Sequence, residues 1–155
     1  MNLKLIFRIF GGLNMLTGAG ALFATSAMLG SAGMTVTPQL ITVGQGFGVT
    51  AIALGLVSWR TSDIAGESLS AYGQLFGIVQ LLQILLIIYH LMTEQAGGPP
   101  VYINLVVGVV LAVLFYFYSQ QYDNSVIISV DEEYNKLFPS LSASGIVLWF
   151  AFKVR

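Results

Sequence analysis

The sequence predicts an all-α integral membrane protein: four transmembrane helices in an up-down-up-down antiparallel bundle, with a short cytoplasmic C-terminal tail. Three observations predict this fold class. Of the 155 residues, 56% are hydrophobic and only 8% are charged, against about 25% charged in soluble domains. Four apolar runs approach or exceed the ~20 residues that a helix needs to cross a bilayer. The turns between them are short, so consecutive helices should be antiparallel neighbours.

The first predicted span covers residues 5–29. Lys4 and Arg8 precede or enter it, and Ala19-Gly20-Ala21 resembles a signal-peptidase site. Because the apolar run continues well past these alanines, we expect a retained span rather than a cleaved signal. Small and weakly polar residues recur along it at spacings of three and four, which allows another helix to approach closely. These residues are Gly11, Asn14, Gly18, Ala21 and Thr25.

The second predicted span covers residues 39–59. Pro38 stands where proline favours the first turn of a helix. Gly44, Gly48 and Gly55 share one stripe of this span, and the first two form a G-x-x-x-G pattern. Trp59 is typical of a residue that anchors a helix at the membrane interface.

The third predicted span, residues 69–92, has two contrasting faces. One face carries the small and polar residues together with two apolar ones: Gly73, Phe76, Gly77, Gln80, Gln83, Ile87, His90 and Glu94. The opposite face is mainly aliphatic: Leu75, Ile78, Val79, Leu82, Leu85, Leu86 and Tyr89. Small and polar groups in a membrane protein face other helices, whereas aliphatic groups face lipid. We therefore expect the glycine and glutamine face to pack against the other spans.

The fourth predicted span covers residues 101–119, with Asn104 and Gly108 on its inward stripe. Residues 1–119 then form the bundle, and residues 120–155 form a tail. The apolar run 145–152 near the end is too short to span as a helix. We expect it to lie in the headgroup region, to form a strand or to dock on a partner.

Basic residues predict the topology. Given four spans, all six lysine and arginine residues fall on the side of the membrane that holds both termini. The positive-inside rule then places both termini in the cytoplasm. With a net charge of −1, the chain has no basic field for nucleic acid, and nucleic acid is not an expected partner.

Polar side chains within the spans are the candidate contact residues. An amide in hydrocarbon is costly unless it is hydrogen-bonded, so we expect these groups to bond across the helices, with a ligand pocket as the alternative. The candidates are Asn14, Gln45, Gln80, Gln83, His90 and Asn104. The candidates for close helix packing are Gly11, Gly18, Gly44, Gly48, Gly55, Gly73, Gly77 and Gly108.

The residue types in the sequence give little support for an enzymatic function. His90 is the single histidine and there is no cysteine, so we expect no metal site and no cofactor. The carboxylates lie in loops, at span ends or in the tail, whereas a proton-coupled carrier needs one at mid-membrane. No G-x-S-x-G pattern is present. We predict no catalytic residue and no enzyme.

In layout the chain resembles small four-span bacterial membrane proteins with glycine-rich helices, and the resemblance covers the four spans only. It implies a bacterial-type plasma membrane. The acidic and arginine signature of four-span glutathione-transferase-like enzymes is absent, as is the membrane glutamate of small multidrug exporters.

The small-residue stripes of the spans and the apolar run 145–152 predict a function in association with other proteins. We expect an accessory or assembly subunit of a membrane complex, or a homo-oligomer, with the bilayer and other membrane subunits as partners. The alternative is a binder or carrier of a small lipophilic molecule, a lipid or quinone, held between the helices. Gln80, Gln83, His90 and Asn104 would then provide the polar lining.

Overall fold

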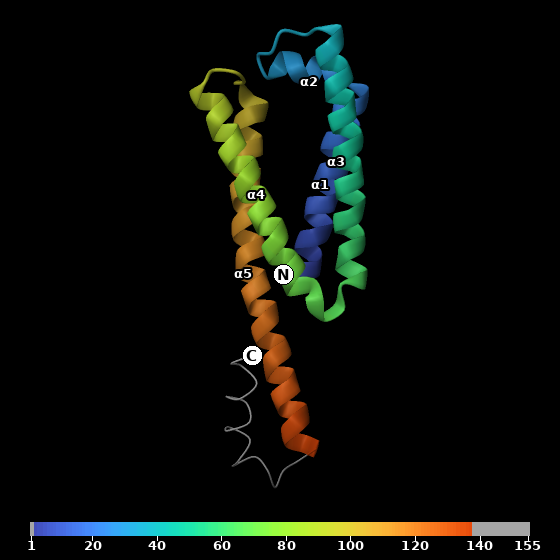
Figure 1. Cartoon of the computed structure of the whole chain (residues 1–155), viewed down its shortest axis with the longest axis vertical. Helices are drawn as coiled ribbons and strands as arrows, with labels where there is room; N and C mark the ends of the chain where they lie inside the picture. Colours follow the sequence, from blue (N-terminus) through green and yellow to red (C-terminus); the bar gives the residue numbers. More distant parts are fainter. Residues whose placement is uncertain (1, 138–155) are drawn as a thin grey trace. The chain divides into compact units, whose positions relative to one another are not determined.

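The computed structural model describes residues 2–137, which form helices and turns only (Figure 1). The elements are α1 (Leu3–Phe23), α2 (Thr25–Ser31), α3 (Pro38–Ile64), the 3-10 turn η1 (Gly66–Ser68), α4 (Leu69–Met92) and α5 (Pro99–Leu137). Four helices, α1, α3, α4 and α5, are long and apolar enough to cross a membrane. This confirms the all-α class and the four candidate spans.

The chain divides into two compact units, Met1–Gln120 and Gln121–Arg155. All packing described below lies within the first unit. The predicted apolar run 145–152 lies outside the described residues.

Local sequence explains where α1 and α3 begin. The Asn2 side chain accepts a 3.0 Å hydrogen bond from the Leu5 amide, and Thr37 does the same for the Leu40 amide at 3.2 Å. Such caps satisfy amide groups that have no partner within the first turn of the helix. Pro38 occupies the first turn of α3, where its missing N–H costs no hydrogen bond.

The first span differs from its predicted extent. The chain leaves helical geometry at Ala24 (φ −127°, ψ 32°), so α1 ends at Phe23 and α2 lies crosswise to α1 and α3 (Figure 1). The Thr25 hydroxyl bonds back to the carbonyl of Ala21, an interaction that commonly bends helices. Hydrophobicity continues to Leu29 but the straight helix does not, which is why the apolar run overestimates the span.

Helices α3 and α5 continue past their predicted ends at residues 59 and 119. In α3 the extra turn carries Arg60 and Asp63. In α5 the sequence between 119 and 137 contains neither glycine nor proline, so polar residues follow the apolar run without interrupting the helix. Hydropathy predicts where a span ends, whereas a helix can continue through polar residues that contain no breaker.

Glycines bring α1 and α3 into backbone contact. A Cβ atom on Gly48 would lie 2.7 Å from the carbonyl oxygen of Gly18, and one on Gly55 would lie 2.7 Å from that of Gly11. Gly11 lies opposite Gly55, and Gly18, further along α1, lies opposite the earlier Gly48 of α3. The two helices are therefore antiparallel. The buried Ser58 hydroxyl donates a 3.0 Å hydrogen bond to the Phe7 carbonyl across the same interface.

Phenylalanines join α1 to α4 and α5. The Phe7 ring lies 5.1 Å from that of Phe76 and 5.0 Å from that of Phe115, both edge to face, and Phe10 contacts the same two rings. We call Phe7, Phe10, Phe76 and Phe115 the phenylalanine cluster. Edge-to-face pairs stabilise beyond the area that they bury. The bundle therefore combines a glycine interface with an aromatic one, where the sequence predicted small-residue stripes throughout.

Helix α4 presents the predicted faces over most of its length. All seven residues of its aliphatic face are exposed, while Gly73, Phe76, Gly77 and Gln80 are buried. A Cβ atom on Gly73 would collide with the Ser119 hydroxyl of α5. The Ser70 hydroxyl also donates a 3.1 Å hydrogen bond to the Ser119 carbonyl. This end of α4 is thus packed closely against α5.

Candidate functional site

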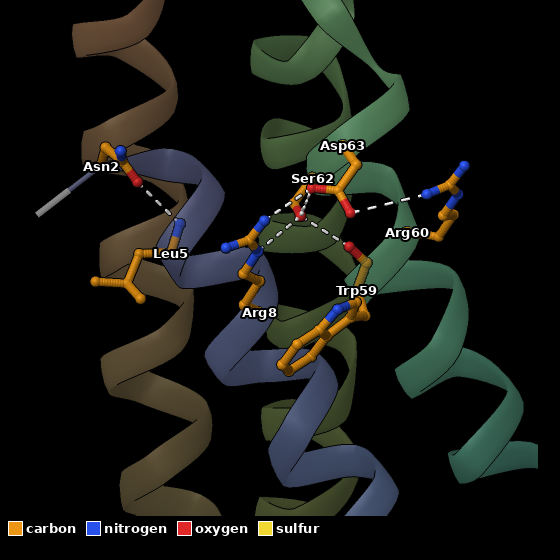
Figure 2. A network of polar contacts seen from close by, with 7 residues as sticks. All are labelled: Asn2, Leu5, Arg8, Trp59, Arg60, Ser62 and Asp63. Carbon is orange, nitrogen blue, oxygen red and sulfur yellow. Dashed lines mark hydrogen bonds and ion pairs between the residues drawn. The ribbon is translucent and has the colours of Figure 1, made fainter.

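Charged residues form one network at the end of the first unit that holds the α1 N-terminus. Figure 2 shows Arg8 reaching Asp63, with Nη2 2.9 Å from Oδ1, while Arg60 approaches the other carboxylate oxygen at 4.0 Å. Arg8 Nε also donates to the Ser62 hydroxyl at 3.4 Å. The side chains of Arg8, Asp63 and Arg60 are 48%, 35% and 70% exposed, and ion pairs that solvent reaches contribute little to stability. The network links the end of α3 to α1.

Two of the candidate amides lie just beyond the phenylalanine cluster. Asn14 follows Phe10 by one helical turn, and Gln80 follows Phe76 by one turn. The Asn14 side chain donates a 2.9 Å hydrogen bond to the Phe10 carbonyl of its own helix. Gln80 is only 6% exposed, and its amide forms no hydrogen bond with another residue in the range 2–137. The interhelical bonds expected of these two amides are therefore not formed.

The other three amides are on the surface. Gln45 on α3, Gln83 on α4 and Asn104 on α5 are all exposed, and none forms a side-chain hydrogen bond within the described part of the chain. On α3, Thr42 and Thr50 flank Gln45 in the sequence, and each donates a hydrogen bond to the carbonyl four residues earlier in its own helix. Gln45, Gln83 and Asn104 thus combine exposure with the absence of a side-chain hydrogen-bond partner among the described residues.

His90 is half-buried near the end of α4, with its ring 5.9 Å from that of Tyr89. The backbone reverses at Glu94, which has a positive φ of 55°, and the Glu94 side chain is exposed. No ion pair joins His90 to Glu94 among residues 2–137. The structure leaves His90 as a polar group at a helix end.

The candidate glycines lie at different kinds of contact. Gly11, Gly18, Gly48 and Gly55 form the α1–α3 backbone contact. Gly44 faces the methyl group of Thr25, and Gly108 faces Ile84. The two α4 glycines pack on α5: Gly73 faces Ser119, and a Cβ atom on Gly77 would lie 3.7 Å from that of Phe115.

A groove runs between α4 and α5 on the outside of the first unit, with a volume of about 480 Å³. Gly77 and Ala112 are buried and form its floor. Apolar side chains form the walls: Ile78, Leu81, Val113 and Phe117. Its polar lining residues are Gln74, Tyr116 and Gln120. None of the predicted lining residues Gln80, Gln83, His90 and Asn104 contributes to it.

The described residues do not form a metal site. Across the described ranges, no three His, Asp or Glu side chains gather as a metal ion would require. A comparison with known proteins finds no matching family model, no matching curated protein and no matching solved structure.

Sequence reasoning missed Gln74, Tyr116 and Gln120 as possible contact residues. Gln74 and Gln120 lie near the ends of their spans, where a polar residue is ordinary and draws no attention. Gly77 and Ala112 could have indicated the groove, because two small residues on facing helices leave unfilled space between larger neighbours. That inference requires knowing which residue of α5 lies opposite Gly77.

Proposed function

We propose that this chain is an interaction protein of the membrane, which associates with another membrane subunit or with further copies of itself. One observation carries the proposal: Gln45, Gln83 and Asn104 are exposed on three different spans without a hydrogen-bond partner among residues 2–137. An unpaired amide in hydrocarbon costs about 1–3 kcal/mol on protein-based scales. A neighbouring membrane helix can accept and donate those hydrogen bonds, and lipid tails cannot.

Gln83 supports the proposal most strongly because it lies deepest. It follows Leu69, the start of α4, by 14 residues and precedes Met92, the end, by nine, which places it ~21 Å and ~14 Å from the two ends. With a hydrocarbon core ~30 Å thick, this position is close to mid-membrane. Water cannot satisfy an amide there, so a partner helix is the remaining source of hydrogen bonds.

Single cysteines test the association, because the chain has no cysteine of its own. We expect Gln45→Cys and Asn104→Cys, which keep the amide of Gln83, to cross-link efficiently in native membranes. Phe47→Cys and Val106→Cys are the matched controls: each lies two residues further along and is also exposed, but faces the other side of its helix. The mass of the adduct distinguishes a second copy from another protein.

The same contact predicts the behaviour of Gln83→Leu. This substitution removes no hydrogen bond within the described chain, so we expect the melting temperature of the isolated protein to be unchanged while cross-linking at Gln45 and Asn104 falls. Cross-linking at the control positions as strong as at the amides, or an unaltered complex in Gln83→Leu, would contradict the proposal.

The proposal includes an orientation: an up-down-up-down arrangement in a bacterial-type plasma membrane, with both termini in the cytoplasm. Arg8 and Arg60 support it, because both approach Asp63 at one end of the first unit, as the positive-inside rule favours. We expect reporter fusions after Arg60 and after Arg155 to give a cytoplasmic signal. Fusions within 30–38 and 94–100 should give the opposite signal. An external signal at Arg155 would require a different number of crossings.

A further inference from the structure

We propose that the groove between α4 and α5 binds one acyl chain of a phospholipid, with the polar part of the lipid at the Gln74 and Gln120 end. This site is separate from the exposed amides that carry the proposed association. Its volume of about 480 Å³ lies within the 300–1,000 Å³ typical of small-molecule sites. It is formed by two candidate spans, so its walls face the region that lipid occupies.

The distribution of polarity along the groove identifies the occupant. Gln74 lies five residues from the start of α4, and Leu81 lies seven residues deeper, a further ~10 Å along the helix axis. Polar side chains therefore stand at the interface end, and the deep end near Leu81 and Val113 is apolar. A phospholipid has the same order, with hydrogen-bond acceptors at the interface and hydrocarbon below. A quinone ring held at the deep end would find no polar group there.

Charge also favours an acyl chain over an ionic ligand. No lining residue of the groove is charged, so the site offers no ion pair to an anionic headgroup. The amides of Gln74 and Gln120 can donate hydrogen bonds to ester or phosphate oxygens. Selectivity should consequently come from the chain in the groove rather than from headgroup charge, and a zwitterionic lipid should suffice.

Small residues make the groove, and this suggests how to close it. A Cβ atom on Gly77 would lie 3.7 Å from that of Phe115 and 3.9 Å from the carbonyl oxygen of Ala112, which are ordinary contacts. A larger side chain at Gly77 therefore clears the α4–α5 backbone and extends into the groove. Gly46→Leu is the matched control, because Gly46 on α3 has no atom within 4 Å of its added Cβ. Val113→Trp fills the groove from its exposed rim. It is a second, independent variant that tests the proposal even if Gly77→Leu does not fold.

The test uses the full chain in phosphatidylcholine vesicles that contain phosphatidylcholine with a photoactivatable diazirine in one acyl chain. We expect adducts concentrated at Ile78, Leu81 and Val113. Leu56 and Val57 of α3 are the reference positions: their exposures of 56% and 58% match the 54–61% of the groove positions. They precede Ile64, the end of α3, by eight and seven residues, and Ile78 follows Leu69, the start of α4, by nine.

Gly77→Leu and Val113→Trp should each lower the remaining groove adducts about tenfold, which corresponds to ~1.4 kcal/mol of binding. Gly46→Leu should leave them unchanged. Equal labelling of the groove and of the α3 reference positions would overturn the proposal, since the groove would then only meet bulk lipid. Protection of the groove from labelling would overturn it as well, because another protein helix would then occupy the site.

Discussion

Replacing Gly48 with leucine should abolish the close packing of α1 on α3 and give one of the two largest losses of stability expected for a single substitution. A Cβ atom at this position would lie 2.7 Å from the Gly18 carbonyl oxygen and 2.8 Å from the Leu22 amide nitrogen. Both are backbone atoms, so no side-chain rotation can relieve the collision. Overpacking a core typically costs about 1–3 kcal/mol, and we expect at least ~3 kcal/mol here because two backbones must separate.

Thermal unfolding in mild detergent, followed by size-exclusion chromatography, measures this effect. Gly46→Leu is the control, because it adds the same side chain two residues away, where nothing lies within 4 Å. Gly18→Leu should match Gly48→Leu, since a Cβ atom there would lie 2.6 Å from the Gly48 carbonyl oxygen. Equal melting temperatures for Gly48→Leu and Gly46→Leu would show that α1 and α3 do not approach through these glycines.

Removing the Phe7 side chain should produce the second large loss. Phe7 is completely buried, and its ring packs between those of Phe76 and Phe115 at 5.1 and 5.0 Å. Truncation of a buried phenylalanine to alanine costs about 3–5 kcal/mol in water-soluble cores. We expect ~3 kcal/mol, the lower end, because lipid is as apolar as the protein interior. The lost ring contacts and the cavity then account for most of the penalty.

Phe23→Ala is the control for Phe7→Ala, because Phe23 is 84% exposed at the end of α1. Its removal should leave the melting temperature nearly unchanged. Phe7→Leu should recover part of the loss by refilling the volume without restoring the edge-to-face contacts. If Phe7→Ala and Phe23→Ala have the same melting temperature, the phenylalanine cluster does not hold α1 against α4 and α5.

Several features of this protein follow from sequence alone because they depend on local composition. The four candidate spans follow from the length of the apolar runs, and the exposed face of α4 follows from the helical period, since every turn repeats the same sidedness. Pro38 predicts the start of α3 because proline has no N–H to donate and its ring clashes with the preceding turn, so a helix tolerates it best in the first turn. None of these inferences requires knowing which helix lies beside which.

Only the tertiary structure shows which side chains are buried between the helices. Phe7 and Phe10 are as apolar as lipid-facing residues, so hydropathy cannot distinguish a ring in the phenylalanine cluster from one that meets acyl chains. Polar candidates show the converse: Gln80 is buried and Gln83 is exposed, although the two share a predicted face. A helical period gives the direction of a side chain but not how far the neighbouring helix extends along that direction.

Hydropathy predicts neither the break at Ala24 nor the groove at Gly77. Apolarity continues through Ala24, and only the Thr25 hydroxyl bonded to the Ala21 carbonyl accompanies the departure from the helix. Gly77 lies close to Phe115 and Ala112 of α5, yet together with Ala112 it also forms the floor of the groove. Whether a glycine closes a contact or opens a space depends on the size of the residue opposite, and only the packed helices determine which residue that is.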